Sequence, residues 1–120
     1  MVPINSTNPL PAYLTSTFPG GSYETVAASQ TDQVLGSTGA VGDVISQLVI
    51  VPAVAASGAV SIKDGSGSSV TVFAGGGTTA LVDLRPQTIT FGAFGAVSVS
   101  GAWKVTTGAN VSVIATGKFT

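Results

Sequence analysis

Residues 58–73 have the sequence GAVSIKDGSGSSVTVF, and this stretch decides the fold more clearly than any other part of the chain. Apolar and small polar residues alternate on both sides of a glycine- and serine-rich segment. Alternation with a period of two is typical of a strand with one buried face, and the Asp-Gly pair supplies the positive φ angles of a tight turn. The stretch therefore predicts a β-hairpin. We expect Val60 and Ile62 to face inward from its first strand, and Val70 and Val72 from its second.

The same kind of pattern recurs on both sides of the hairpin. Short runs rich in Val, Ile, Thr and aromatic residues are separated by Gly, Pro, Asn or Ser, and no run has helical spacing. The strands expected outside the hairpin span residues 31–36, 43–51, 80–84, 87–91, 96–100, 102–106 and 111–115. We therefore expect an all-β fold, an antiparallel β-sandwich of jelly-roll-like form, because two packed sheets limit the number of exposed edges.

The composition indicates a chain that buries apolar surface against partners. Of its 120 residues, 44% are apolar and only 8% are charged, whereas roughly 25% are charged in ordinary soluble domains. The surplus apolar surface is expected to be covered by other copies or by a larger assembly. The net charge of −1, without a basic cluster, argues against nucleic acid as a partner. We expect no membrane insertion, because the longest apolar run, residues 48–56, is too short for a span and contains a proline.

Residues 1–27 are expected to form an extended, proline-rich N-terminal arm, and residues 28–120 the β-sandwich domain. Four of the six prolines lie in the arm, where each removes a backbone donor and restricts the residue before it. The arm also carries apolar and aromatic side chains that are candidate assembly contacts, namely Tyr13, Leu14, Phe18 and Tyr23. An arm docked on its own domain or on a neighbouring subunit would need such anchors. A terminus without fixed contacts is the alternative.

The sequence offers little basis for enzyme chemistry. It has no His and no Cys, so histidine-based triads, thiol catalysis and the usual zinc sites cannot be built. The acidic residues are Glu24, Asp32, Asp43, Asp64 and Asp83. Asp32 and Asp43 stand at expected strand starts, and Asp64 belongs to the hairpin turn, where one carboxylate with weak hydroxyl ligands falls short of a calcium site. Asp83 can pair with Arg85 on one strand face. We expect no enzyme activity, no catalytic or metal-binding residue and no cofactor.

Trp103, the only tryptophan, has two interpretations. It is either a core anchor or an exposed platform on which a sugar ring stacks, and the core is the commoner place for a lone tryptophan. A carbohydrate-binding module would normally show several aromatic residues with amide and acid groups beside them. Phe91 and Phe94 are most simply explained as core or subunit contacts.

A resemblance adds to this interpretation. It is carried by the segments SQTDQVLG (29–36), GAVGD (39–43), SIKDGSG (61–67), VFAGG (72–76) and SGAWKVTTGANV (100–111). In these segments the chain resembles small virion structural proteins of tailed bacteriophages, which occur as capsid decoration (cement) proteins, head fibres or tail-associated modules. The family has no catalytic residues to carry over. The resemblance implies a protein of the virion capsid surface that is assembled in the host cytoplasm.

Two functional hypotheses follow. In the first, the protein cements a bacteriophage capsid as a homotrimer at capsomer junctions, with the major capsid protein and its own copies as partners. In the alternative, it is a receptor-binding or fibre-tip module that recognises host-surface glycans. Trp103 separates them: an exposed, sugar-sensitive Trp103 favours the glycan module, and a buried one favours the structural role.

Overall fold

The computed structural model describes residues 21–76 and 84–120, and the only regular structure in these residues is β-strand. The strands are β1 (Ser22–Val26), β2 (Gln33–Val34), β3 (Val44–Pro52), β4 (Val60–Asp64), β5 (Val70–Phe73), β6 (Gln87–Thr90), β7 (Ala96–Val97), β8 (Trp103–Thr107) and β9 (Val111–Lys118). The strand expected at residues 80–84 lies outside the described residues, apart from Leu84. The other expected strands are present, although β2 and β7 are only two residues long.

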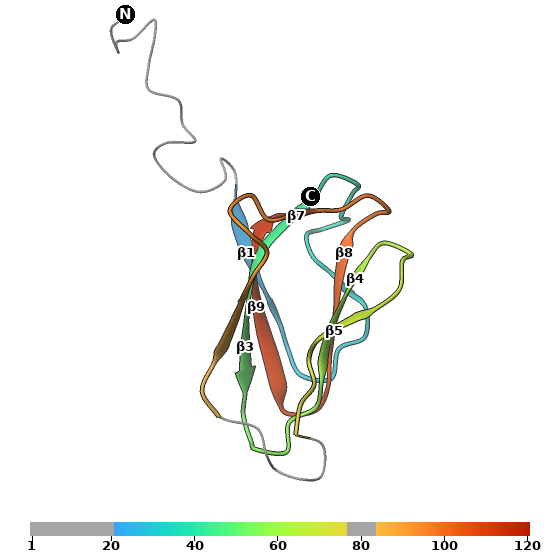
Figure 1. Ribbon diagram of the computed structural model, residues 1–120. Coiled ribbons are helices and arrows are strands. Elements are labelled where there is room, and N and C mark those ends of the chain that lie inside the picture. The colour runs from blue at the N-terminus through green and yellow to red at the C-terminus, as the bar shows by residue number, and fades with distance from the viewer. Residues whose placement is uncertain (1–20, 77–83) are drawn as a thin grey trace, which may run out of the picture.

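The strands form two antiparallel sheets that face each other, so the fold is the expected all-β sandwich (Figure 1). The larger sheet has the order β1-β9-β3-β6, with β7 also paired to β3, and the smaller has the order β2-β8-β4-β5. The pairs are nested along the chain. β4 pairs with β5, β3 with β6 and β7, β2 with β8, and β1 with β9. The first and last described strands are therefore neighbours in one sheet.

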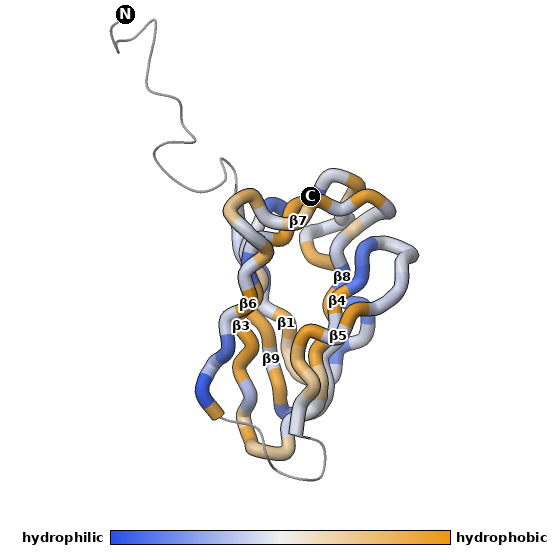
Figure 2. The backbone as a smooth tube through the Cα atoms, viewed as in Figure 1, coloured by the Kyte–Doolittle hydropathy of each residue, from blue (hydrophilic) through white to orange (hydrophobic). Residues whose placement is uncertain are grey.

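The core lies between the two sheets and follows from the alternation of the strands. In β9, for example, Val111, Val113 and Ala115 are buried while the residues between them point away. The hydropathy-coloured tube in Figure 2 shows apolar residues along the facing strands of both sheets. The buried apolar residues are Val26, Leu35, Ile45, Leu48, Ile50, Val60, Ile62, Phe73, Trp103, Val105, Val111, Val113 and Ala115.

The hairpin of β4 and β5 confirms part of the expectation and corrects another part. Val60 and Ile62 are buried, but Val70 is 58% exposed, so the prediction that it faces inward is wrong. The reason is a register shift: Val60 lies opposite Phe73, whereas the next residue of β4 lies opposite Thr71. This bulge changes the face that each residue of β5 presents. Phe73 then fills the core, and the residue before it is partly buried against the core.

β1 corrects the expected boundary between the arm and the sandwich. Ser22–Val26 were expected in the arm, but they pair with β9 along the whole strand, and Val26 is fully buried. The sequence does not show the alternation of a strand here, because Glu24, a charged residue, occupies the inward position before Val26. Its carboxylate accepts a hydrogen bond from the backbone N–H of Gly36, which compensates for its partial burial. The sandwich therefore begins at Ser22.

The edge of the larger sheet beside β3 consists of two short strands in line. β6 pairs with residues 47–50 of β3 and β7 with residues 44–45. Between them, the N–H of Phe91 donates to the carbonyl of Ser46 (3.0 Å), and the chain then leaves the ladder in a turn at residues 92–95. Gly92 and Gly95 both have positive φ, which favours glycine. The interruption brings residues 94–99 to one end of the sandwich, close to where β1 begins (Figure 1).

Candidate functional site

One end of the sandwich carries a strip of exposed apolar side chains. Its members are between 56% and 85% exposed, and they lie on the loop before β3 and on the segment between β6 and β8. Figure 2 shows the apolar colour around β7 and on these adjoining loops. We call Val41, Phe94, Val97 and Val99 the apolar strip. Grouped exposed apolar residues with no role in the core are typical of an interaction surface.

The backbone beneath the strip is anchored by Ser98. This serine is buried, and the two valines on either side of it point outward. Its N–H donates to the carbonyl of Asp43 (2.8 Å), and its hydroxyl donates to the carbonyl of Ala40 (2.9 Å). Its own carbonyl accepts from the N–H of Gly42 (3.0 Å). The segment that presents the strip is therefore held to the loop before β3 by direct hydrogen bonds.

Asp64 holds the same segment from the other side. As expected, it lies at the hairpin turn, where its carbonyl accepts from the N–H of Gly67 (2.8 Å). Its carboxylate also accepts from the N–H groups of Val99 (2.9 Å) and Ser100 (3.1 Å). The N–H of Val99 lowers the pKa of Asp64, against a smaller rise from desolvation, and the N–H of Ser100 lowers it further. The charged carboxylate of Asp64 thus fixes the backbone at Val99 and Ser100, at the end of the strip.

Asp43 forms the buried polar support under this end of the molecule. It precedes β3, as expected from the sequence, and its carboxylate accepts from the N–H of Ala40 (3.0 Å) and from both the N–H (3.1 Å) and the hydroxyl of Thr120. Burial alone would raise the pKa of Asp43, but the hydrogen bonds from Thr120 and Ala40 outweigh it and hold the pKa below its ordinary value. The loop before β3 is thereby tied to residue 120.

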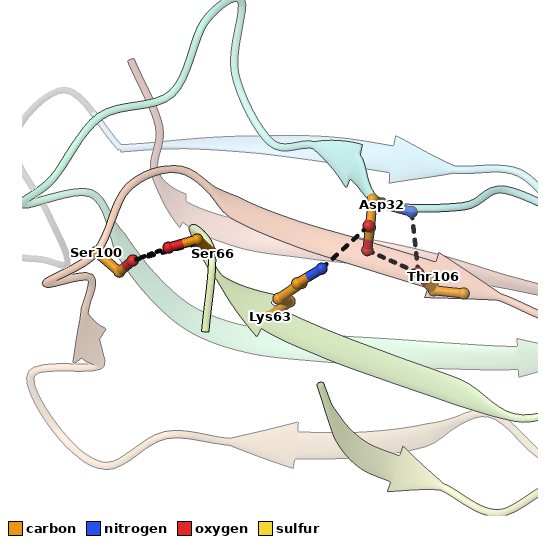
Figure 3. A network of polar contacts seen from close by, with 5 residues as sticks. All are labelled: Asp32, Lys63, Ser66, Ser100 and Thr106. Carbon is orange, nitrogen blue, oxygen red and sulfur yellow. Dashed lines mark hydrogen bonds and ion pairs between the residues drawn. The ribbon is translucent and has the colours of Figure 1, made fainter. Parts of the chain in front are cut away.

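A second polar network lies on the smaller sheet and is structural (Figure 3). Lys63 Nζ lies 3.3 Å from Asp32 Oδ2, and both side chains are partly exposed. The Asp32 N–H donates to Thr106 Oγ1 (2.9 Å), and this hydroxyl donates to Asp32 Oδ1 (3.3 Å). The hydroxyls of Ser66 and Ser100 lie 3.1 Å apart. A partly exposed ion pair such as Lys63–Asp32 contributes about 0.2–1 kcal/mol. Together with Thr106, this pair connects the start of β2 to β4 and β8, and it forms no reactive site.

Trp103 is a core residue. It is buried, and its Nε1–H donates to the carbonyls of Asp43 (3.1 Å) and Ala96 (3.2 Å). It cannot serve as an exposed platform for a sugar. The core interpretation of Trp103 is therefore confirmed, and its indole links the strip segment to the loop before β3.

Comparison of the chain with protein-family models, curated proteins and solved structures finds no significant match. Within residues 21–76 and 84–120, no three His, Cys, Asp or Glu residues gather where they could hold a metal ion. The described residues also contain no helix long and apolar enough to cross a membrane. The surfaces of the sandwich itself therefore carry the argument about function.

The structure places one of the four expected assembly contacts. Tyr23 lies on β1 and is 70% exposed, on the outer face of the larger sheet rather than in the apolar strip. Tyr13, Leu14 and Phe18 lie outside the described residues, and so does Asp83, the expected partner of Arg85. Sequence reasoning named Phe94 as a core or subunit contact but did not predict the strip as a whole. Val41 and Phe94 lie in loops, and the alternation of residues 96–100 did not show which face of that strand would be exposed. The general signal for an apolar contact surface was the surplus of apolar residues.

A hollow of about 420 Å³ lies beside Tyr23. Residues 21–23 of β1 and its approach, residues 46–47 of β3 and residues 116–117 of β9 line it. No Asp, Glu, Lys or Arg is among these lining residues. The hollow is the second candidate site of the described structure, and it differs from the strip because residues with hydroxyl and amide groups are among those that line it.

Proposed function

We propose that this protein is a non-enzymatic virion structural protein that decorates and stabilises a bacteriophage capsid. It acts on the capsid surface as a homotrimer at capsomer junctions, with the major capsid protein as its partner. The observation that carries the proposal is the apolar strip, because it is exposed, anchored and free of reactive groups. The resemblance of residues 29–36, 39–43, 61–67, 72–76 and 100–111 to phage virion proteins supplies the biological setting.

The arrangement of the strands supports this class of protein. With β6 and β7 taken as one interrupted strand, the nested pairs follow the course of a long hairpin rolled into two sheets. We propose that the sandwich is a jelly roll on this basis. Jelly rolls are common among viral capsid and lectin domains. Since one fold hosts many functions, the surface of the sandwich, rather than its topology, has to specify the partner.

The strip suits a permanent structural contact for two physical reasons. Full burial of one valine or phenylalanine side chain contributes about 1.5–3 kcal/mol, so even partial burial of the strip favours association. The hydrogen bonds of Ser98 and Asp64 already fix the backbone beneath it, which lowers the entropy lost on binding. Because the strip carries no charge, screening by salt does not weaken a contact of this kind.

A capsid-stability assay tests the proposal. Purified protein is added to capsids that lack it, and the temperature of capsid rupture is measured at low and at high salt. We expect a higher rupture temperature at both. The double variant Val97→Ser, Val99→Ser should lose the gain while keeping its own fold, because both side chains are exposed.

Val70→Ser is the matched control, because Val70 is an exposed valine on β5, outside the strip. It should stabilise capsids as well as the unmodified protein does. If saturating unmodified protein gives no gain in rupture temperature, the cement function is wrong. If the double variant stabilises capsids fully, the strip is not the contact.

A further inference from the structure

The hollow beside Tyr23 is built into the larger sheet by a β-bulge. Ile45 lies opposite Gly117 and Gln47 opposite Thr116, so Ser46 is an extra residue in β3. The hydroxyl of Ser46 donates to the carbonyl of Thr116 (3.0 Å). Bulges of this kind bend a strand, re-aim side chains and are frequent beside binding sites.

Gly117, on β9 opposite the bulge, allows the two strands to approach closely. A Cβ atom at this position would lie 2.0 Å from the carbonyl oxygen of Val44, a distance that no side chain can tolerate. Only glycine therefore allows β9 to approach the bulged strand this closely. The hollow is specified by two residues, the bulge serine and the glycine opposite it, and does not depend on the rotamer of one flexible side chain.

The side chains around the hollow combine one aromatic ring with uncharged polar groups. Tyr23 is largely exposed, so its ring is open to solvent. In the described parts of the chain, neither its hydroxyl nor the carboxamide of Gln47 takes part in a hydrogen bond. The hydroxyls of Ser46 and Thr116 lie 3.2 Å apart, and the Thr116 hydroxyl also donates to the carbonyl of Gln47 (3.4 Å). Each hydroxyl can still accept a hydrogen bond from a further donor.

This chemistry selects a class of ligand. A phosphate or carboxylate is bound most strongly by a cationic side chain, and the lining residues include none. An apolar peptide would leave the carboxamide and hydroxyls without partners, which costs about 1–3 kcal/mol for each group that becomes buried. A neutral sugar satisfies both parts, because its C–H face can pack on the tyrosine ring while its hydroxyls bond to the amide and hydroxyl groups.

We propose that this hollow is a binding site for a neutral sugar unit, with Tyr23 as the stacking platform and Gln47, Ser46 and Thr116 as hydrogen-bonding partners. The volume of about 420 Å³ falls within the range of small-molecule sites. The site goes beyond the capsid-stabilising role and is separate from the apolar strip. It assigns the glycan contact to Tyr23, since Trp103 is buried.

The test uses the full-length purified protein labelled with ¹⁵N. Its amide signals are recorded during titration with the methyl glycosides of glucose, galactose, mannose and N-acetylglucosamine. We expect at least one of them to give saturable shifts confined to residues 21–23, 46–47 and 116–117, with a Kd of about 1 mM. Because no charged group lines the hollow, the Kd should not change with salt.

Three variants make the test specific. Tyr23→Ala should weaken binding about tenfold, equivalent to about 1.4 kcal/mol, while Tyr23→Phe should retain most of it because the ring remains. Thr88→Ala, which removes an exposed hydroxyl from β6 of the same sheet, should leave the Kd unchanged. Capsid stabilisation by Tyr23→Ala should be normal, so failure of the sugar site and failure of the cement function are distinguishable.

Two outcomes would overturn the sugar site. One is the absence of saturable shifts at about 50 mM of every glycoside, a concentration well above the expected Kd. The other is that a synthetic peptide of residues 1–20 produces the shifts at the hollow and the glycosides do not, which would make the hollow a peptide-docking site. Shifts that persist unchanged in Tyr23→Ala would equally remove tyrosine stacking from the proposal.

Discussion

Asp43 illustrates how a single charged residue can serve an almost uncharged protein. Its carboxylate is buried, a position that favours the neutral acid, but three hydrogen bonds from Ala40 and Thr120 keep it ionised. Its backbone carbonyl also accepts from the indole of Trp103 and from Ser98. One residue thus joins the core, the loop before β3 and the segment that presents the apolar strip.

Asp43→Asn should lower the free energy of unfolding by about 2 kcal/mol at pH 7, because an amide offers one acceptor oxygen where the carboxylate offers two. The effect should depend on pH. The pKa of Asp43 is lower in the folded protein than its ordinary value of 3.8, so the carboxylate stabilises the fold above that value. The stabilisation is lost as the pH falls through the folded pKa.

Denaturant unfolding at pH 7 and near pH 3 measures this effect. The difference in stability between the unmodified protein and Asp43→Asn should shrink at the lower pH. Asp32→Asn is the control, because its ion pair with Lys63 is partly exposed and contributes about 1 kcal/mol at most. An equal loss of stability for Asp43→Asn at both pH values would contradict the ionised, hydrogen-bonded Asp43.

Residue-level predictions from sequence succeeded where periodicity applies. Val60 and Ile62 are inward because strand alternation is strict, and Trp103 is buried because a large apolar ring gains most from the core. Val70 was misplaced because a bulge shifts the alternation, and a bulge leaves little trace in a single strand. The hydrogen bond from the N–H of Val99 to the carboxylate of Asp64 was not predicted, because partners 35 residues apart cannot be paired from one sequence.

At the scale of an element, the close approach of β9 to the bulge in β3 predicts a large effect of substituting Gly117. Gly117→Ala should destabilise the protein by about 2–4 kcal/mol, since the added methyl group meets the backbone of Val44 and the strands must separate. Gly67→Ala is the matched control. Its Cβ would lie 3.0 Å from the nearest atom, compared with 2.0 Å at residue 117, and neither glycine needs a left-handed φ. Chemical denaturation compares the two.

A loss below about 0.5 kcal/mol for Gly117→Ala, the range of an ordinary surface substitution, would show that the two strands do not approach each other as described. The same variant should also abolish glycoside shifts at the hollow. Gly67→Ala should leave them intact, because it lies on the hairpin of the other sheet.

Element-level predictions located most strands but missed their lengths and one strand entirely. β1 was not predicted, because the prolines earlier in the chain suggested an arm and because Glu24 occupies an inward position. The expected strand at residues 96–100 shrinks to two residues because the N–H groups of Val99 and Ser100 donate to the carboxylate of Asp64 and not to a neighbouring strand. Loop geometry and pairing partners decide such boundaries, and alternation reports neither.

For the whole molecule, two truncations separate the arm from the sandwich. Deletion of residues 1–20 should leave the melting temperature nearly unchanged, because the ladders of both described sheets run from Ser22 to Lys118. Deletion of residues 1–27 should prevent stable folding, because it removes β1 and the buried Val26. Thermal unfolding monitored by circular dichroism distinguishes the two.

The same proteins address the arm's role in assembly. By light scattering at micromolar concentration, the full-length chain should have the mass of a trimer. Deletion of residues 1–20, which removes Tyr13, Leu14 and Phe18, should lower this mass or weaken capsid binding. A monomeric full-length protein would contradict the homotrimer, and unchanged mass and capsid binding after the deletion would contradict an arm that makes assembly contacts.

At this scale the sequence predicted the architecture but not its surfaces. Turn signals and alternation were enough for an antiparallel sandwich without helices, because few other folds accommodate such short strands. Low charge predicted that some surface is covered by a partner, and this stays a prediction. Where exposed apolar side chains gather could not be foreseen. Residues 41 and 94–99 meet only after folding, and so do the three strands around Tyr23.

The position of β9 has a consequence for how the chain is made. It is the last of the described strands to leave the ribosome, but it lies between β1 and β3 in the larger sheet. β1 must therefore wait for a partner while roughly 85 intervening residues are synthesised, which takes on the order of ten seconds at typical rates of translation. During that time the edges of β1 and β3 that pair with β9 lack their partner strand. A newly made chain should depend on chaperones until its final strand closes the sheet.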